Sequence, residues 1–274
     1  MKMKKGTLVS VVLLLAAVSL GYAQEPGPGG LHGSVDVTYL SKYVWRGFDI
    51  YNDKSAIQPS VNLDLGGGVG ASVMGHRANS SGYEDGERWD YYLHYSNAIN
   101  PGEKNAVNYR IGYVYYNYPD MSSSIADLQE LHAILSFPNI LPVKGLVPTY
   151  VLVKLWPSES GSMVGCKSPA GGTASGFAHI FMLDYGIPVQ GMGTGSPEQV
   201  INLHSEVVFN DGVGPNGANV DQDWSNAVFG ISTTFDLGGN FSLTPGVYHQ
   251  VTMDESVNDD KDETWASVSA TYKF

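Results

Sequence analysis

Cysteine is almost absent from this chain, since Cys166 is the only one among 274 residues and no disulfide can form within the chain. Long apolar runs are scarce too, and none after Leu20 approaches the length of a membrane-spanning helix. Basic side chains are few, with 15 Lys and Arg against 27 Asp and Glu and a formal net charge of −12. These features exclude a disulfide scaffold and a helical membrane protein, and the negative charge argues against nucleic acid as a partner.

Sequence patterns for metals and cofactors are missing as well. The seven histidines are scattered without the paired spacing of a metal site. Glycine clusters such as Gly66 to Gly68 have the form of turns, and no glycine-rich loop opens a helix to cradle a nucleotide. We therefore expect neither a cofactor nor a bound metal.

The amino-terminal segment has the form of a secretory signal peptide. The basic start MKMKK precedes about thirteen mainly apolar residues, Leu8 to Leu20, and the small residues Gly21 and Ala23 follow. This pattern predicts export and cleavage before Gln24, after which 12 basic and 27 acidic residues leave a formal charge of −15. The expected organisation is a signal peptide, a short periplasmic segment and a single domain, at 1–23, 24–33 and 34–274.

The last eleven residues, TWASVSATYKF, alternate between two kinds of side chain. The apolar-leaning register consists of Thr264, Ala266, Val268, Ala270, Tyr272 and Phe274. A tilted strand of about this length spans the hydrocarbon core of a bilayer, with one face toward lipid and the other toward water. The terminal Phe274 also resembles the aromatic carboxyl-terminal signature of bacterial outer-membrane barrels, which implies the barrel-assembly machinery as a partner.

Segments of this alternating kind recur along the whole chain, separated by turn-rich joints that alternate between short and long. Most have about eleven residues, whereas strands of soluble sandwiches have about five or six; a large secreted β-sandwich is the alternative. The pattern predicts an all-β, transmembrane, antiparallel up-and-down β-barrel of about 12 strands with both chain ends in the periplasm. The expected strands are 34–46, 55–65, 69–78, 88–97, 106–118, 126–137, 146–156, 177–187, 199–210, 224–237, 241–252 and 264–274.

Two features weaken the prediction of individual strands. Leucines 128, 131 and 135 have helical as well as strand spacing, and a short helix over 124–137 would spoil the even strand count. Pro59, Pro148 and Pro245 fall within expected strands, where each removes a hydrogen-bond donor from the ladder. We expect bulges or local fraying at these prolines.

Charge decides which face of each strand looks inward, because Lys or Arg at mid-membrane costs roughly 2–4 kcal/mol on a lipid face. In the first expected strand Tyr43 and Trp45 share the lipid-facing register, while Lys42 and Arg46 face the lumen. Tyr and Trp near strand ends are expected in the interfacial girdles. The candidate pore-lining residues are Asp36, Lys42, Arg46, Asp64, Arg88, Asp90, Arg110, Glu130, Lys154, Asp184, Glu206 and Asp236.

This mixed-sign lining permits two interpretations. The charges line a narrow aqueous path with a slight preference for cations, or they lock into a salt-bridged plug. The loop 157–176 is expected to decide between them by folding inward or standing outward. Arg46, followed by Gly47 at the outer end of the first strand, is expected to bridge a neighbouring carboxylate as a clamp, with solute selection as the alternative. The acidic run 254–263 is expected to be a solvated loop, with divalent cations at lipopolysaccharide as the alternative.

Several motifs resemble those of the TorF-like porin family of Gram-negative bacteria. These are SKYVWRGFDI (Ser41 to Ile50), a strand beginning at Ala56, WDYYLHYS (Trp89 to Ser96) and IGYVYYNYPD (Ile111 to Asp120), and the resemblance covers mainly residues 34 to 120. It implies an outer-membrane barrel in contact with lipid and lipopolysaccharide, through which small solutes or ions diffuse. A non-conducting barrel that binds or stabilises the surface is the alternative.

One short segment is similar to a catalytic motif. His94 to Ala98 resembles the His-x-Ser-Asn segment of the outer-membrane lipid A deacylases, and a strand places His94 and Ser96 on the same face. The segment falls inside the stretch that the porin motifs explain, those deacylases have fewer strands, and the sequence fixes no third group. We therefore predict no catalytic residues and no enzyme, with a hydrolase of this kind as the minor alternative.

Overall fold

The structure is a computed structural model of the chain that describes residues 32–124, 126–158, 175–191, 199–212, 220 and 222–274. The predicted signal peptide, most of the segment 24–33, Cys166 and residues 159–174 of the loop 157–176 lie outside the described residues. Among the described residues, no helix has the length and apolarity needed to cross a membrane.

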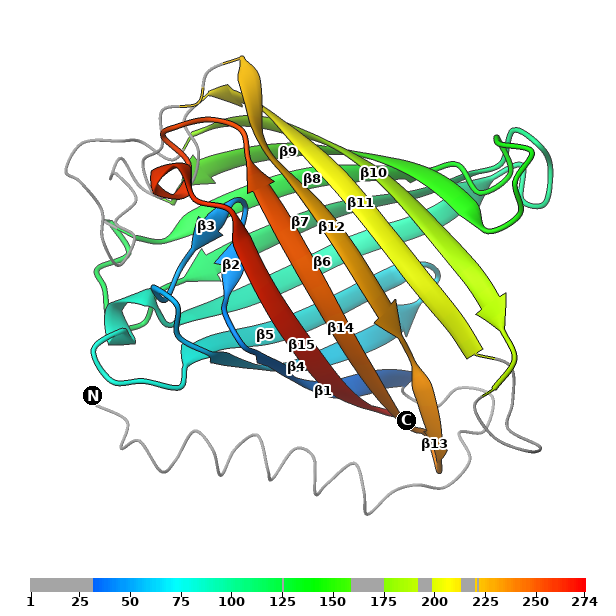
Figure 1. Cartoon of the computed structure of the whole chain (residues 1–274), viewed down its shortest axis with the longest axis horizontal. Helices are drawn as coiled ribbons and strands as arrows, with labels where there is room; N and C mark the ends of the chain where they lie inside the picture. Colours follow the sequence, from blue (N-terminus) through cyan, green and yellow to red (C-terminus); the bar gives the residue numbers. More distant parts are fainter. Residues whose placement is uncertain (1–31, 125, 159–174, 192–198, 213–219, 221) are drawn as a thin grey trace.

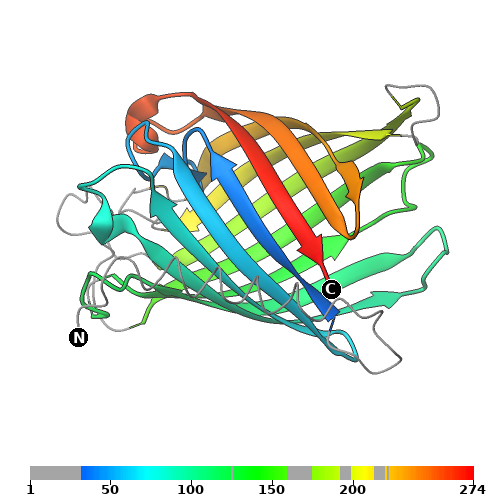
Figure 2. The ribbon, with the colours of Figure 1, turned by 90° about the horizontal axis from the view of Figure 1, so that it is seen from below.

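Twelve antiparallel strand positions form a closed barrel (Figures 1 and 2). Each strand pairs with its sequence neighbours, and the barrel closes where β1 pairs with β15. β12 and β13 together form one position, because both pair with β14. The barrel strands are β1 (His32–Leu40), β4 (Ala56–Gly66), β5 (Val69–Ala78), β6 (Arg88–Ile99), β7 (Val107–Asn117), β8 (Leu128–Ser136), β9 (Leu146–Pro157), β10 (Gly176–Val189), β11 (Gln199–Gly212), β12 (Asp223–Thr233), β13 (Phe235–Gly238), β14 (Phe241–Thr252) and β15 (Glu263–Lys273).

The two ends of the barrel differ in their connections. At one end, here called the turn end, lie short turns such as Gly66 to Gly68 and the two chain ends of the barrel, where Gly33 and Phe274 exchange two backbone hydrogen bonds of 3.0 Å. At the other, the loop end, longer connections carry two short 3₁₀ helices, η1 (Glu84–Gly86) and η3 (Asn258–Asp260). Short turns at one end and long loops at the other are the arrangement of outer-membrane barrels.

Alternation of side chains confirms the predicted faces over most of the barrel. On β6, Tyr91, Leu93 and Tyr95 are exposed on the outside, whereas Asp90 on the inner register is buried. On β15, the outward register runs from Thr264 through Val268 as expected, with every second residue exposed. The outer surface is therefore apolar, as a bilayer requires.

The two doubtful features have clear outcomes. Residues 128–136 form strand β8 rather than a helix, so the even strand count holds. At Pro59 the ladder to β5 loses pairs without a change of register. Pro245 lies beside the break between β12 and β13, whereas the pairing is continuous at Pro148. The expected disruption is therefore confirmed at two of the three prolines.

The first predicted strand is wrong beyond Leu40. The chain turns inward there and forms a small hairpin, β2 (Val44–Trp45) and β3 (Phe48–Asp49), which lies inside the barrel near the loop end (Figure 1). Its two-residue turn needs positive φ at both positions, and Arg46 (φ 50°) and Gly47 (φ 94°) supply it. Residues 47–51, which lie between the first two expected strands, are therefore part of the lumen filling, whereas residues 52–54 are exposed. We call residues 43–50 the inner hairpin.

Candidate functional site in the barrel lumen

The tip of the inner hairpin is fixed to opposite walls of the barrel. Arg46 Nη2 lies 2.5 Å from Glu130 Oε2 on β8, an ion pair between a largely buried guanidinium and a buried carboxylate. On the other side, Gln250 Nε2 of β14 donates a 2.7 Å hydrogen bond to the carbonyl of Gly47. Burial lowers the pKa of Arg46, but the Glu130 carboxylate outweighs it and the pKa is raised above its ordinary value. This is the geometry that the clamp interpretation of Arg46 requires.

The base of the inner hairpin is held by Lys42. Its ammonium contacts Asp53 at 2.5 Å and also pairs with the buried carboxylate of Glu263. Burial lowers the pKa of Lys42, while the hydrogen bonds to both carboxylates raise it above its ordinary value of 10.5. Asp49 lies beside these two carboxylates, with oxygens within 4.8 Å of one another. Such a set of oxygens could hold a cation, and here the Lys42 ammonium fills that role for two of the carboxylates, Asp53 and Glu263.

The loop expected to be fully solvated takes part in this anchoring. Asn258 Oδ1 accepts a 3.0 Å hydrogen bond from the backbone N–H of Asp49, and Val257 packs against Phe48. Glu263, at the end of the acidic run, is buried in β15. The expectation of a solvated run is therefore wrong for Glu263, because that carboxylate faces Lys42 inside the barrel.

Arg88 is the centre of a second buried network. Its guanidinium lies over the rings of Trp45 and Tyr116, 4.0 and 4.7 Å from their centroids. It donates to both carboxylate oxygens of Asp90, at 2.6 and 2.9 Å, and to the hydroxyl of Tyr43 at 3.0 Å. A buried charge is tolerated because it is paired, hydrogen-bonded and stacked on aromatic faces. Tyr43 and Trp45 thus fill the lumen and do not face lipid, contrary to expectation.

Glu130 connects the hairpin to the interior of the barrel. Besides the contact with Arg46, its carboxylate accepts a 2.7 Å hydrogen bond from the hydroxyl of Tyr116 and lies 3.1 Å from Nδ1 of His132. Tyr116 belongs to a buried cluster on the inner face of β7 that also contains Val114. The inner hairpin therefore packs against the β6 to β8 side of the wall.

Open space remains on the other side of the hairpin. Two cavities of about 210 and 230 Å³ lie there, and Arg46 and Glu206 border both of them. The imidazole of His204 lies between two carboxylates, 2.7 Å from Asp184 and 3.6 Å from Glu206. Polar side chains thus line the space between the hairpin and strands β10 to β14.

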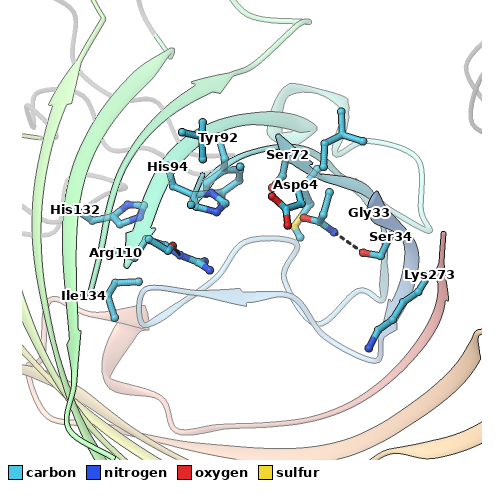
Figure 3. A pocket seen from close by; sticks show the side chains of 17 residues that line it. Gly33, Ser34, Asp64, Ser72, Tyr92, His94, Arg110, His132, Ile134 and Lys273 are labelled. Atoms are coloured by element: carbon cyan, nitrogen blue, oxygen red, sulfur yellow. Dashed lines mark hydrogen bonds between the residues drawn. The ribbon is translucent and has the colours of Figure 1, made fainter. Parts of the chain in front are cut away.

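A larger cavity of about 770 Å³ occupies the turn end of the lumen (Figure 3). Arg110 of β7 points into it, and its Nε donates a 2.9 Å hydrogen bond to Ser96 Oγ. His94, His132 and Lys273 line the same cavity. Beside them on the wall are Ser34, Asn62, Asp64, Ser72, Tyr92 and Ile134.

Ten of the twelve candidate pore-lining residues lie on the inner hairpin or on the inward register of a barrel strand, an eleventh, Lys42, lies at the base of the hairpin, and several of them play structural roles. Asp36 accepts hydrogen bonds from Thr271 and Asn62, at 2.5 and 2.8 Å. Asp64 and Asp236 accept from the backbone N–H two residues on, each at 2.8 Å, and so stabilise turns at the turn end. Arg46 meets Glu130, Arg88 meets Asp90 and Lys42 is paired at the hairpin base.

Lys154 is the exception, and its assignment to the lumen is wrong. It pairs in register with Leu131 and Phe177, both exposed on the outer surface, and its ammonium lies 4.5 Å from the ring centroid of Phe177. The inward register of β9 holds Val151, Val153 and Leu155 instead. Charge alone could not reveal this, because β9 is apolar on both faces.

The deacylase-like segment lacks an activated nucleophile. The hydroxyl of Ser96 accepts the hydrogen bond from Arg110, and the imidazole of His94 lies across Gly70, where an added Cβ would meet its Nε2 at 2.6 Å. No hydrogen bond joins His94 to Ser96 in the described structure. A nucleophile and its base need such a contact, so this geometry gives no support to hydrolysis.

Several lumen residues escaped sequence analysis. Tyr43 and Trp45 were expected to face lipid, Tyr116 was not singled out, and Gln250 and His132 carried no signal of their own. An inward position for Tyr116 was readable from its register, since Tyr113 and Tyr115 alternate with it on the outside. Leu40, Ser41 and Val44 break the alternation before Arg46, but the break does not show that Tyr43 and Trp45 turn inward.

Comparison with known proteins supports the fold. A family model described as "Bacterial protein of unknown function (Gcw_chp)" matches residues 24–144. No curated protein matches the sequence. Among solved structures, a NanC porin superposes with a TM-score of 0.51 at 11% identity, covering 88% of this chain and 100% of its own.

A KdgM porin in complex with disordered oligogalacturonate gives a TM-score of 0.50 at 9% identity, covering 88% of this chain and 99% of its own. LpxR from Salmonella typhimurium gives a TM-score of 0.45 at 8% identity, covering 88% of this chain and 100% of its own. Likeness to the two porins at such low identity shows that this chain has the fold of outer-membrane porin barrels.

Proposed function

We propose that this chain is a porin-like channel of the bacterial outer membrane, through which small solutes or ions diffuse passively. The turn end faces the periplasm and the loop end faces outward. The inner hairpin forms a constriction near the loop end. The loop 157–176, which was expected to decide whether the lumen is open, lies mostly outside the described residues.

The single observation that carries this proposal is the distribution of space around the inner hairpin. The hairpin packs on the β6 to β8 side and is tied to β14 at its tip, while cavities of about 210 and 230 Å³ with mixed polar and apolar lining remain beside strands β10 to β14, and one of about 770 Å³ lies at the turn end. A barrel whose lumen is filled by side chains has no such space. The proposed path runs past Arg46 and Glu206, which border both smaller cavities.

The remaining predicted residues have roles within this proposal. Asp184, Glu206 and Arg110 line the path, whereas Lys42, Arg88, Asp90 and Glu130 set the position of the constriction through their ion pairs. The expected slight preference for cations stays part of the proposal. Each ion pair removes one acid and one base, and with Lys154 outside the lumen seven of the remaining candidates are acidic and four are basic.

Location and partners follow from the sequence. The signal peptide supports export, the apolar outer face fits outer-membrane lipid and lipopolysaccharide, and Phe274 is the expected contact with the barrel-assembly machinery. The motifs between residues 34 and 120 support placement in the TorF-like porin family. The porin fold of the structural neighbours supports the barrel and not the family, and the family model that matches residues 24–144 describes a family of unknown function.

The alternative is a non-conducting barrel, and the buried networks around Arg88 and Glu130 favour it. Both guanidinium groups at the hairpin are paired with carboxylates, which is the chemistry of a permanent plug. In that case the hairpin would seal the loop end.

Single-channel conductance of the refolded mature chain in a planar bilayer tests the proposal. We expect discrete current steps, and Glu206→Gln to shift the reversal potential toward anions, since it removes a negative charge from the path. Lys154→Gln on the outer surface is the matched control and should leave the reversal potential unchanged. A folded, heat-modifiable barrel that stays silent would contradict the channel and establish the plugged alternative.

A further inference from the structure

The cavity at the turn end contains a cation without a counter-charge. We infer that this cavity binds the carboxylate group of small anionic solutes through Arg110, an inference that rests on the proposed channel function and names the class of solute it carries.

The hydrogen bonding of Arg110 prepares it for an anion. Its Nε donates to Ser96 Oγ at 2.9 Å, which fixes the plane of the guanidinium. No carboxylate among the described residues forms an ion pair with it, so its terminal nitrogens face the cavity (Figure 3). A planar fork of N–H donors matches the two oxygens of a carboxylate.

The other arginines of the lumen show what an occupied site looks like. Arg46 lies 2.5 Å from Glu130, and Arg88 holds Asp90 with two hydrogen bonds. In both cases the protein itself supplies the carboxylate. Among the described residues, Arg110 is the inward-facing arginine that has no carboxylate of the protein as a partner.

The walls of the cavity favour an anion over a cation. Lys273, on the inward register of β15, also lines the cavity and has no ion-pair partner among the described residues. Among the described residues that line the cavity, Asp64 is the one with a carboxylate side chain, and its Oδ1 accepts a 2.8 Å hydrogen bond from the backbone N–H of Gly66. The cavity thus carries two cations against one acid, although the whole chain has a net charge of −12.

The rest of the lining suits a small polar body attached to the carboxylate. The imidazole of His94 lies along the wall over Gly70, with no hydrogen-bond partner in the described structure. Hydroxyl groups of Ser34 and Ser72 lie on the same lining. A volume of about 770 Å³ falls within the range of about 300–1,000 Å³ typical of small-molecule sites.

Binding of succinate to the refolded mature chain in detergent, measured by calorimetric titration, tests this inference. Succinamide has nearly the same size without the charge and is the control ligand. We expect succinate to bind at least about tenfold more tightly than succinamide. Arg110→Gln should weaken the binding of succinate by about tenfold or more, as the loss of a bidentate pair implies. Arg77→Gln is the matched control, because Arg77 lies on the outer face of β5 beside Glu87, 3.0 Å away, and should not change binding.

The possible results separate the two proposals. Equal binding of succinate and succinamide by the wild-type chain, or unchanged binding in Arg110→Gln, would overturn the carboxylate site even if the barrel conducts. Selective binding of succinate by a barrel that is silent in the bilayer would support the site and contradict the channel. If Arg110→Gln does not fold, Lys273→Gln and the two-ligand comparison on the wild-type chain decide the question.

Discussion

Two neighbouring residues, Arg46 and Gly47, decide how the lumen is filled. Both have positive φ, at 50° and 94°, and together they reverse the chain inside the barrel. This turn places the Arg46 guanidinium beside Glu130, 84 positions further along the chain. Conformation and charge at this one position therefore act together: the turn allows the ion pair, and the ion pair holds the turn.

Gly47→Ala tests this at the scale of a residue. An added Cβ would meet Val257 Cγ1 at 2.9 Å and Asn226 Oδ1 at 3.1 Å, in a backbone conformation that L residues rarely adopt. We expect the free energy of unfolding to fall by about 2–5 kcal/mol, from about 1–2 kcal/mol of backbone strain and about 1–3 kcal/mol of overpacking. Urea unfolding of the detergent-folded barrel measures it.

Gly82→Ala is the matched control for that substitution. Gly82 has nearly the same φ, 91°, but nothing lies within 4 Å of an added Cβ. It should show the strain alone, so the difference between the two variants reports the packing of the hairpin tip. Equal losses in both would show that the tip is not tightly packed against the wall.

At the scale of elements, the inner hairpin and the barrel are separable. The wall strands are joined by their own continuous ladders, and the hairpin adds pairs only between β2 and β3. Its contacts with the wall are side-chain contacts and a few hydrogen bonds to the backbone. The barrel wall should therefore form without the hairpin, but its lumen should then be open.

Replacing Val44 to Asp49 with Gly-Gly tests this separation. The backbone N–H of Ile50 donates to the carbonyl of Tyr43 at 2.9 Å, so the two ends are already adjacent and a two-residue turn can join them. We expect a folded barrel whose single-channel conductance rises several-fold, because the constriction is gone. Deleting the exposed residues 80–82, at the same barrel end, should leave the conductance unchanged. An unaltered conductance in the shortened hairpin would place the constriction elsewhere.

At the scale of the whole molecule, closure joins the two ends of the chain. β1 pairs with β15 over seven residue pairs, from Ser34 with Lys273 to Leu40 with Ser267. Without that seam both edges would present unpaired N–H and C=O groups to lipid, where each costs several kcal/mol.

Removing residues 264–274 should therefore abolish folding into lipid vesicles, measured by the loss of the heat-modifiable gel band. Phe274→Ala is the control, since it keeps the whole seam and alters only the proposed assembly signal. We expect it to fold in vesicles that contain no assembly machinery. Folding of the truncated chain would show that the remaining strands close by another pairing.

The sequence by itself determined the barrel, because the features that specify it are local. Alternation with a period of two locates the strands, and turn-rich joints of alternating length set the up-and-down order. β8 shows how far this goes: its leucines also fit a helix, yet its place between two other alternating segments indicated a strand.

Only the tertiary structure decided what fills the lumen. Leu40, Ser41 and Val44 interrupt the alternation between Tyr39 and Arg46. Such a break does not show the direction of the turn, which depends on partners such as Glu130 and Gln250 in distant strands. Lys154 was misplaced for a related reason, because the facing of a strand that is apolar on both sides is set by its pairing with its neighbours. Local pattern fixes the wall, and contacts between residues far apart in the chain fix the interior.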